Sequence, residues 1–527
     1  MIKVRSPLKQ LNNNFKEKMK LFFILFSLLI PALGVAQKNV VVATSADPGH
    51  LNPGITTGYN VHVFADSIYS GLVMLDRSLQ PSPDLAESWR VEDNSKTYRF
   101  FLRKNARWHD GKPVTSKDVK FTFENVLFKY HSRTKAGLSK IVTEIQTPTD
   151  HEVVFKLSNS YGPMLSRLDV TEAPILPAHI FSTGDANDHP ANLNPIGSGP
   201  FKFVEYRKGE YVKLQKNDNY YLSGLPKIDN LIIQVIPDGV TQLLALESGE
   251  VDYIDRVPGK ELRRMEANSD ISLQKNTAGP GGGNCIMTVS FNLEREKTSN
   301  HLLRQALAHA INRDRILEQV LFGLGRVAAA PINKGIEWAH LSGTLESYNF
   351  SHDKANRLLD QAGFTRDEDG VRMSLDIVHF PRFNKYAEVM KQDLAQVGIK
   401  LISRPMDRSA AVDNIFNQRD FDLNLISYCN GADPDIGVKR MYVSSNIGNI
   451  PFSNASAYRN QEIDKLFKEA GQTSDIKQRS AKYAQIQTIL AKDLPYWWLV
   501  ETQSLTAHRN DMSNFRSWSG NFAVMAQ

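Results

Sequence analysis

One stretch of forty residues, 85–124, constrains the fold of this chain more than any other. Within it, residues 97–102 (TYRFFL) are β-branched and aromatic, which predicts a strand. Residues 109–113 (HDGKP) predict a turn, because Asp-Gly tolerates a positive φ and proline fixes the exit. Thr115 has an acidic residue three positions later, which is typical of a helix N-cap. The stretch therefore predicts a compact strand–turn–helix unit with Trp108 packed at its corner.

The length and the charge distribution limit the class of protein. A chain of 527 residues is too long for a single core, so two or three domains are expected. The net charge of +6 is concentrated at the start, where residues 1–20 carry +5, and the rest is close to neutral. A near-neutral body argues against nucleic acid or an anionic membrane surface as a partner.

The first residues have the pattern of an export signal. Basic residues precede an uninterrupted apolar run at 21–30, Pro31 ends the run, and residues 34–36 are small. The run is too short to span a bilayer, so we predict a cleaved signal peptide over residues 1–36, with Met19 as an alternative start. No cysteine follows the run, so we expect a free periplasmic protein without a lipid anchor.

The only two cysteines, Cys285 and Cys429, leave two alternatives open. They could form a disulfide in an oxidising compartment, or they could be two separate buried thiols. Their spacing along the chain does not decide between these. Two cysteines do exclude a cysteine-rich scaffold and a zinc ribbon.

The pattern of the second half predicts a parallel sheet. A strand at 374–379, an amphipathic helix at 384–396 and a strand starting at 397 follow one another, and 421–427 is a further strand. In a β-α-β arrangement the loop after each strand points toward the ligand side of the sheet. Near the start of the chain, residues 61–74 predict one amphipathic helix.

Several motifs resemble one known family. The 85–124 segment contains LAESW, a Y-x-F-x-L-R strand and W-H-D-G-x-P-x-T-x-x-D-V, which resemble the signature of solute-binding protein family 5. These are the periplasmic dipeptide- and oligopeptide-binding proteins of ABC importers. Residues 194–206 are similar to its G-S-G-P-F motif, and residues 303–313 to its V-R-Q-A-L-x-x-A-I-D-R helix, with Asn312 in place of the aspartate. The resemblance covers nearly all of the mature chain.

The resemblance implies an α/β fold of two lobes, the type II periplasmic-binding-protein fold of the large peptide-binding class. It also implies an extra subdomain in the first lobe, and two crossing segments about which the lobes close on a ligand. The corresponding division is 1–36 for the signal peptide, 37–74 and 195–278 for the first lobe, 75–194 for the extra subdomain, 279–500 for the second lobe, and 501–527 for the return to the first lobe.

The chain lacks the motifs of common enzymes. It contains no G-x-S-x-G, H-E-x-x-H, G-x-x-x-x-G-K-[ST] or C-x-x-C motif, and its histidines are scattered. His62 and His309 fall within apolar helices, where a structural role is favoured. Residues 323–328 fit G-x-G-x-x-A but follow a helix instead of a strand, so they are not read as a cofactor loop. The glycine cluster at 279–284 is read as flexible backbone near a domain crossing. We therefore predict a binding protein without catalytic activity, cofactor or metal.

The candidate ligand-binding residues come from the resemblance. Arg382 lies where dipeptide-binding relatives carry an arginine for the ligand carboxylate, which suits its planar fork, although a solvated loop arginine is the alternative. Those relatives also carry an extra aspartate before a G-D-P-D run, which this chain lacks; Asp433 could serve, but it is also predicted to cap a helix. Four aromatic candidates could form apolar walls or belong to the core. The full set is Thr57, Gly58, Tyr59, Asn60, Arg382, Phe383, Tyr428, Asn430, Asp433 and Trp498.

Taken together, these features predict the periplasmic substrate-binding component of an ABC transporter. It would capture a peptide or peptide-like solute by hinge closure and deliver it, as a monomer, to a membrane permease with its ATPase. The alternatives are the same scaffold binding an opine, an oligosaccharide or a metal chelate or haem. A hydrolase of secreted peptides is disfavoured by the missing catalytic groups.

Overall fold

The computed structural model describes residues 38–76, 79–276, 284–343, 345, 347–448, 450–510 and 512. The predicted signal peptide, residues 279–283 of the glycine cluster and the end of the chain lie outside these ranges. No helix among the residues described is long and apolar enough to cross a membrane.

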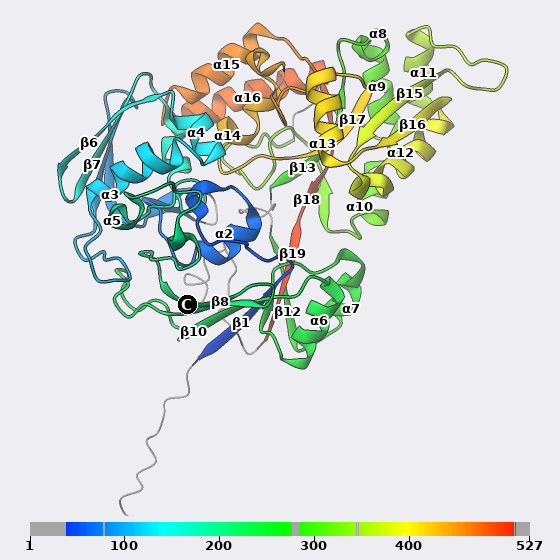
Figure 1. Ribbon diagram of the computed structural model, residues 1–527. Coiled ribbons are helices and arrows are strands. Elements are labelled where there is room, and N and C mark those ends of the chain that lie inside the picture. The colour runs from blue at the N-terminus through cyan, green and yellow to red at the C-terminus, as the bar shows by residue number, and fades with distance from the viewer. Residues whose placement is uncertain are drawn as a thin grey trace, which may run out of the picture.

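The first lobe is built on a seven-stranded sheet of order β12-β19-β11-β1-β10-β9-β8, at the bottom of Figure 1. Strand β1 pairs in parallel with β10 on one side and β11 on the other, and β8 and β9 form an antiparallel hairpin. The strands are β1 (Asn39–Thr44), β8 (Phe201–Arg207), β9 (Tyr211–Lys216), β10 (Asn230–Val235), β11 (Tyr253–Ile254), β12 (Ile271–Asn276) and β19 (Ser504–Arg509). The helices are α2 (Tyr59–Ala65), α6 (Gly239–Ser248) and α7 (Leu262–Glu266).

The second lobe contains a six-stranded sheet of order β14-β18-β13-β17-β15-β16. Strand β15 pairs in parallel with both β16 and β17, so the predicted parallel arrangement is confirmed for these three strands, whereas β13, β14 and β18 pair in antiparallel fashion. The strands are β13 (Cys285–Phe291), β14 (Gly325–Val327), β15 (Met373–His379), β16 (Ile399–Pro405), β17 (Leu423–Cys429) and β18 (Tyr496–Thr502). The helices are α8 (Glu296–Ser299), α9 (His301–Ala310), α10 (Arg313–Gln319), α11 (His352–Gln361), α12 (Asn384–Gln396), α13 (Arg408–Val412), α14 (Pro434–Gly437), α15 (Gln461–Gly471) and α16 (Ile476–Asp493).

An extra subdomain, on the left of Figure 1, contains an antiparallel sheet of order β4-β5-β7-β6 and the small β2–β3 pair. The predicted N-cap is confirmed, since Thr115 and Asp118 form a capping box at the start of α3. Trp108 is 2% exposed within the subdomain core, as the corner prediction requires. The elements are β2 (Val73–Leu75), β3 (Pro81–Pro83), β4 (Ala86–Glu92), β5 (Thr97–Leu102), β6 (Val142–Thr149), β7 (Glu152–Leu157), α3 (Ser116–Phe121), α4 (Ser132–Leu138) and α5 (Ala178–Phe181).

The chain passes between the two large sheets in two places. It leaves β12 of the first sheet at Asn276 and enters β13 of the second at Cys285, and it returns from β18 to β19 across a single residue. Figure 1 shows the second passage as the red strands that connect the upper and lower sheets. The apolar clusters divide largely between the two lobes, although Leu79 of the extra subdomain packs into the second-lobe cluster and Leu324 packs into a first-lobe cluster.

The predicted helix at 61–74 is wrong in its second half. Helix α2 ends at Ala65, and residues 73–75 form strand β2. The intervening backbone bonds to other segments instead: Ile68 O accepts from Gly199 N at 2.8 Å, and Ser70 O accepts from Ile175 N at 2.9 Å. The apolar spacing of this stretch therefore reflects burial among several segments, which mimics a helical period.

The fold decides whether the two cysteines are paired and what role the two helical histidines have. Cys285 and Cys429 face each other across the β13–β17 pair and are joined by a disulfide. His62 and His309 are structural, as predicted: His62 Nδ1 lies 2.8 Å from Asp66 Oδ1, and His309 Nδ1 lies 2.7 Å from Asn349 O.

His109, next to the buried corner, is held as a neutral imidazole. Its Nδ1 accepts from Gly197 N at 3.2 Å and its Nε2 donates to Gly199 O at 3.0 Å. A second proton on Nδ1 would point at the Gly197 N–H, and burial lowers the pKa of His109 to about 4.

This environment makes the protein sensitive to acid. The pKa of His109 in the folded protein lies below its unfolded value of about 6.5. The contribution of His109 to folding stability is therefore complete above pH ~6.5 and is lost as the pH falls toward 4. Between pH 7 and pH 4.5, we expect the free energy of unfolding to fall by about 2 kcal/mol less in His109→Gln than in the wild type. Denaturant unfolding at the two pH values measures this difference, and equal losses in both proteins would contradict the prediction.

Candidate functional site

The loops that follow the parallel strands of the two sheets form the candidate site. In open α/β sheets, ligands bind beyond the carboxyl ends of such strands. In the first lobe, Thr44 ends β1 and Asp255 and Arg256 follow β11. In the second lobe, Arg382 follows β15 and Arg408 follows β16. Val257 N, just after Arg256, donates to Leu505 O at 2.7 Å beside the crossing from β18 to β19, and the end of β17 at Cys429 pairs with Cys285, where the other crossing enters β13. The parallel strands of both lobes therefore end on the side of the crossing segments, and the like charges of Arg408 and Arg256 both lower the pKa of Arg382.

The first-lobe side of the site is organised around Asp255. Its Oδ2 accepts from Tyr59 Oη and from Thr44 Oγ1, each at 2.9 Å. Its Oδ1 is buried and has no hydrogen-bond partner among the residues described. Burial raises the pKa of Asp255, although the two hydroxyl donors and Arg256 partly offset the shift. An acceptor oxygen in such a position can take a hydrogen bond from a donor on a ligand.

The predicted loop at 57–60 leads into this cluster. Gly58 precedes α2, whose first turn contains Tyr59 and Asn60, so the helix begins two residues before the predicted start at 61. Tyr59 is 38% exposed while its hydroxyl donates to Asp255. Asn60 Nδ2 donates to Asp47 O at 3.3 Å, which ties the loop to the chain before it, and Thr57 is half-buried.

The second-lobe side presents Arg382. Its guanidinium is exposed and stacks on two rings, with its carbon 4.8 Å from the centroid of Phe383 and 5.4 Å from that of Phe380. Partial burial and then the like charges of Arg408 and Arg256 lower its pKa. Among the residues described, no carboxylate lies within ion-pairing distance of Arg382. Phe383 is 7% exposed, so it forms an apolar base under the guanidinium.

Three other candidates are engaged inside the second lobe. Tyr428 and Trp498 are each at most 2% exposed, and Trp498 Nε1 donates to Tyr442 Oη at 2.9 Å. Asn430 is 1% exposed, and its Oδ1 accepts from Asn333 N at 2.6 Å. These contacts are internal to the lobe.

Asp433 is also satisfied within the protein. Its two carboxylate oxygens accept from the two terminal nitrogens of Arg479, each at 2.6 Å, and both side chains are at most 4% exposed. Oδ1 also accepts from Asp435 N at 2.9 Å, so the predicted N-cap of α14 is confirmed. Three hydrogen bonds from within the protein therefore engage this carboxylate, two of them from its buried counter-charge.

The geometry therefore places Arg382 at a strand end of the second lobe and the Tyr59 hydroxyl against Asp255 of the first. It adds Asp255, Arg256 and Arg408, which were not predicted from the sequence. A signal for the missed residues existed, since Arg408 follows the parallel strand β16 just as Arg382 follows β15. Strand β11 has only two residues, too few to show any periodicity, so nothing in the pattern pointed to Asp255 and Arg256.

The extra subdomain contacts the second lobe directly. Ser95 Oγ donates to Ser474 Oγ at 3.1 Å, and Tyr161 Oη donates to Asp435 Oδ2 at 3.3 Å. Gly162 approaches Thr473 O so closely that a Cβ would collide with it. These contacts are polar, and beside them Leu79 of the subdomain packs into the apolar cluster of the second lobe.

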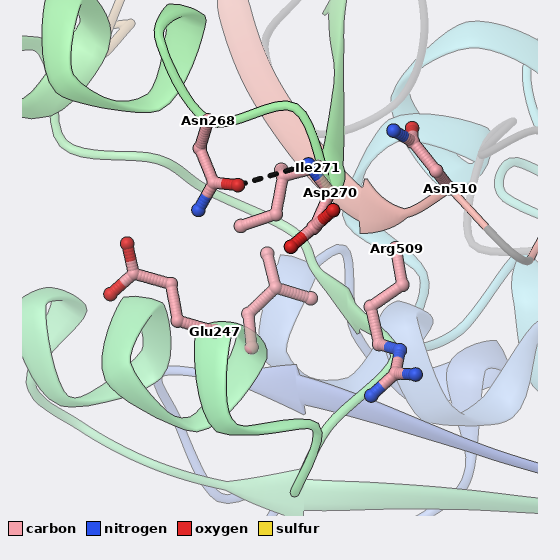
Figure 2. Close-up of a pocket in the computed structure, with 7 residues that line it drawn as sticks. Glu247, Asn268, Asp270, Ile271, Arg509 and Asn510 are labelled. Atoms are coloured by element: carbon pink, nitrogen blue, oxygen red, sulfur yellow. Dashed lines mark hydrogen bonds between the residues drawn. The ribbon is translucent and has the colours of Figure 1, made fainter.

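A surface hollow of about 340 Å³ lies elsewhere, between α6, the start of β12 and the end of β19. Figure 2 shows Glu247, Asp270 and Arg509 around it, with the Asn268 side chain accepting from Asp270 N. Strand β19 runs antiparallel to β11, so its last residue, Arg509, lies at the opposite edge of the sheet from Asp255. The hollow is therefore separate from the candidate site.

The chain is similar in sequence and in fold to bacterial solute-binding proteins. The family model described as bacterial extracellular solute-binding proteins, family 5 Middle, matches residues 80–449. The oligopeptide-binding protein AppA of Bacillus subtilis (strain 168) is 29% identical over 496 residues, covering 91% of this chain and 89% of that protein. The structure of AppA from Bacillus subtilis with a nonapeptide has a TM-score of 0.72 at 27% identity, covering 92% of this chain and 97% of that one. The structure of AgaA from A.tumefacien R10 with agropinic acid has a TM-score of 0.73 at 26% identity, covering 93% and 96%.

Proposed function

The chain belongs to the bacterial extracellular solute-binding proteins, family 5, and from this premise we propose that it captures a peptide or peptide-like solute for an ABC importer. The observation that carries the proposal is Arg382, an exposed guanidinium without a carboxylate partner among the residues described, at the strand ends where the two lobes face each other. A free ligand carboxylate matches its planar fork with two parallel hydrogen bonds.

Binding would proceed by closure of the lobes. The solute first meets one set of strand-end loops, and its contacts with the other set then favour the closed form. Arg382 would hold the carboxylate, Phe383 and Phe380 would keep the guanidinium in place, and Tyr59 would position Asp255 to accept a hydrogen bond from the solute. The closed form would be recognised by a membrane permease whose ATPase supplies the energy.

The remaining parts of the proposal concern location and organisation. We propose a periplasmic protein, exported by a cleaved signal peptide over residues 1–36 and without a lipid anchor. We also propose that 37–278 and 501–527 form the first lobe, with 75–194 as its extra subdomain, and that 279–500 form the second. The protein would act as a monomer without catalytic activity.

Arg382→Ala is expected to weaken binding of a dipeptide with a free carboxylate by about 2 kcal/mol, roughly thirtyfold. A dipeptide amide should bind the variant and the wild type almost equally, because it lacks the charge that Arg382 holds. Isothermal titration calorimetry measures both. Arg90→Ala is the matched control, since Arg90 is also exposed and stacked on a phenylalanine, 5.5 Å from the ring of Phe101. Unchanged affinity in Arg382→Ala would refute the carboxylate role.

Native mass spectrometry of the protein purified from periplasm tests the solute class. A retained mass that corresponds to short peptides supports the proposal. A second candidate, an opine, is favoured by the relative with agropinic acid and by the absence of an extra acid before Asp433, and a retained opine mass would select it. A retained oligosaccharide, haem or metal chelate would overturn both.

A further inference from the structure

Three arginines at the candidate site form no ion pair with any acid in the part of the chain that the structure describes. Arg256 comes from the first lobe, and Arg382 and Arg408 come from the second. All three are exposed, and no carboxylate among the residues described lies within ion-pairing distance of any of them. Arg408 stacks on Phe452, 5.1 Å from the ring centroid, as Arg382 stacks on Phe383. Both second-lobe guanidinium groups are thus held on aromatic rings with their hydrogen-bonding edges free.

Two other arginines of the second lobe, Arg404 and Arg479, form ion pairs with acidic residues. Arg404, four residues before Arg408, forms ion pairs with Asp376 at 2.7 Å and with Asp420 at 3.1 Å. Arg479 is neutralised by Asp433. Arg404 and Arg479 therefore have acidic partners, whereas no ion pair is formed by the three arginines at the strand ends among the residues described.

The acids nearest in sequence to these arginines are already engaged. Asp255, beside Arg256, accepts from Tyr59 and Thr44. Asp407, beside Arg408, caps α13 by accepting from Ser409 N at 2.9 Å and Ala410 N at 3.1 Å. Neutral donors do not cancel the charge of a carboxylate, and Asp255 interacts electrostatically with Arg256, but neither acid forms an ion pair with the three guanidinium groups. These groups can therefore take further negative charge from a ligand.

This distribution of charge also affects closure. The like charges of Arg256 and of Arg382 and Arg408 approach each other as the lobes close, which opposes closure while the site is empty. A solute with carboxylates between them removes this repulsion and adds charge-assisted hydrogen bonds from both lobes.

Resting on the proposed function, we propose that the solute carries at least two carboxylate groups and that Arg256, Arg382 and Arg408 hold them from the two lobes. The chemical class is a short dicarboxylate with an amide or amine backbone, as in an acidic dipeptide or an N-carboxyalkyl amino acid. Its negative charge is what makes closure favourable.

The test compares two dipeptides of equal size and different charge, together with a smaller polycarboxylate. Ligand-free wild type is titrated with Glu-Glu, Gln-Gln and N-(1-carboxyethyl)glutamate by calorimetry. We expect at least one of the two polycarboxylates to bind more than tenfold tighter than Gln-Gln at low salt, with the difference decreasing as salt is raised. Which of the two binds tighter identifies the source, peptide or N-carboxyalkyl amino acid.

The variants Arg256→Gln and Arg408→Gln identify the residues. Each is expected to weaken the tighter polycarboxylate at least tenfold and to leave Gln-Gln within twofold, whereas Arg90→Gln changes neither. Without ligand, Arg256→Gln should increase the closed fraction, measured as a smaller radius of gyration by small-angle X-ray scattering. Thermal unfolding of each variant confirms that it is folded.

The possible failures are distinguishable. If Gln-Gln binds as tightly as both polycarboxylates, the dicarboxylate inference is overturned while the peptide function stands. Equal effects of Arg256→Gln on charged and neutral solutes would also overturn the inference. If none of the three solutes binds and the purified protein retains an uncharged oligosaccharide, the peptide function and the inference both fail.

Discussion

Replacing Asp433 by alanine is expected to lower the free energy of unfolding by about 3–5 kcal/mol, because it leaves a buried guanidinium without its counter-charge. Arg479 is 4% exposed at its side chain, and both of its terminal nitrogens donate to Asp433. Its Nε donates to Ala470 O at 2.9 Å, so the side chain is fixed and cannot turn toward water easily. The variant also loses the N-cap of α14, which adds about 1 kcal/mol. Denaturant unfolding measures the combined loss.

Two controls separate the buried pair from an ordinary surface charge. Glu462→Ala removes the partner of Lys465 in a pair whose side chains are 61% and 51% exposed, so a loss below about 1 kcal/mol is expected. The double variant Asp433→Ala/Arg479→Met should recover much of the loss, because no unpaired charge remains buried. If Asp433→Ala instead unfolds like the wild type and only loses ligand affinity, the carboxylate belongs to the ligand and our assignment is wrong.

Asp433 also illustrates how far a sequence can locate a site. Its capping role was predictable, since aspartate followed by proline is a local signal for the start of a helix. Its ion pair was not, because Arg479 lies 46 residues away on α16 and only the packing of the lobe brings the two together. A ligand role remained open for Asp433 until that partner was known.

Local signals predicted most of the fold. The strand, turn and capping box of the 85–124 segment need only residues that are near in sequence, and the alternation of strands and helices in the second lobe indicated its parallel sheet. The helix at 61–74 was overestimated because its apolar residues contact several segments, and burial on many sides produces a pattern similar to helical amphipathicity.

The candidate site was harder to predict because it combines two lobes. Arg382 was found through a resemblance, whereas Arg256 follows a strand of two residues and becomes relevant only because the first lobe faces the second. The sequence also could not indicate that Tyr428 and Trp498 are internal, since an aromatic residue near a strand end is equally compatible with a core and with a pocket wall.

Breaking the disulfide is the second change with a large expected effect. Cys285 and Cys429 are 144 residues apart, and a closed loop of this length restricts the unfolded chain strongly. The chain-entropy relation gives a loss of about 5 kcal/mol for a loop of this size. We therefore expect Cys285→Ala/Cys429→Ala to unfold at a clearly lower denaturant concentration than the oxidised wild type. The wild type in excess reductant should behave like the variant.

The position of the disulfide within the second lobe predicts that its removal leaves ligand affinity unchanged. It joins the first residue of β13 to the last residue of β17, two strands of one sheet that are also paired along their length and by Asn430 N donating to Asn284 O at 3.2 Å. Because the bond lies within the second lobe, the folded geometry of Arg382 and Arg408 does not depend on it, and ligand affinity should stay within about twofold of the wild type. The single variant Cys285→Ala should lose as much stability as the double variant, since either substitution opens the loop. Equal stability of the oxidised and reduced wild type would show that the loop constraint is absent from the mature protein.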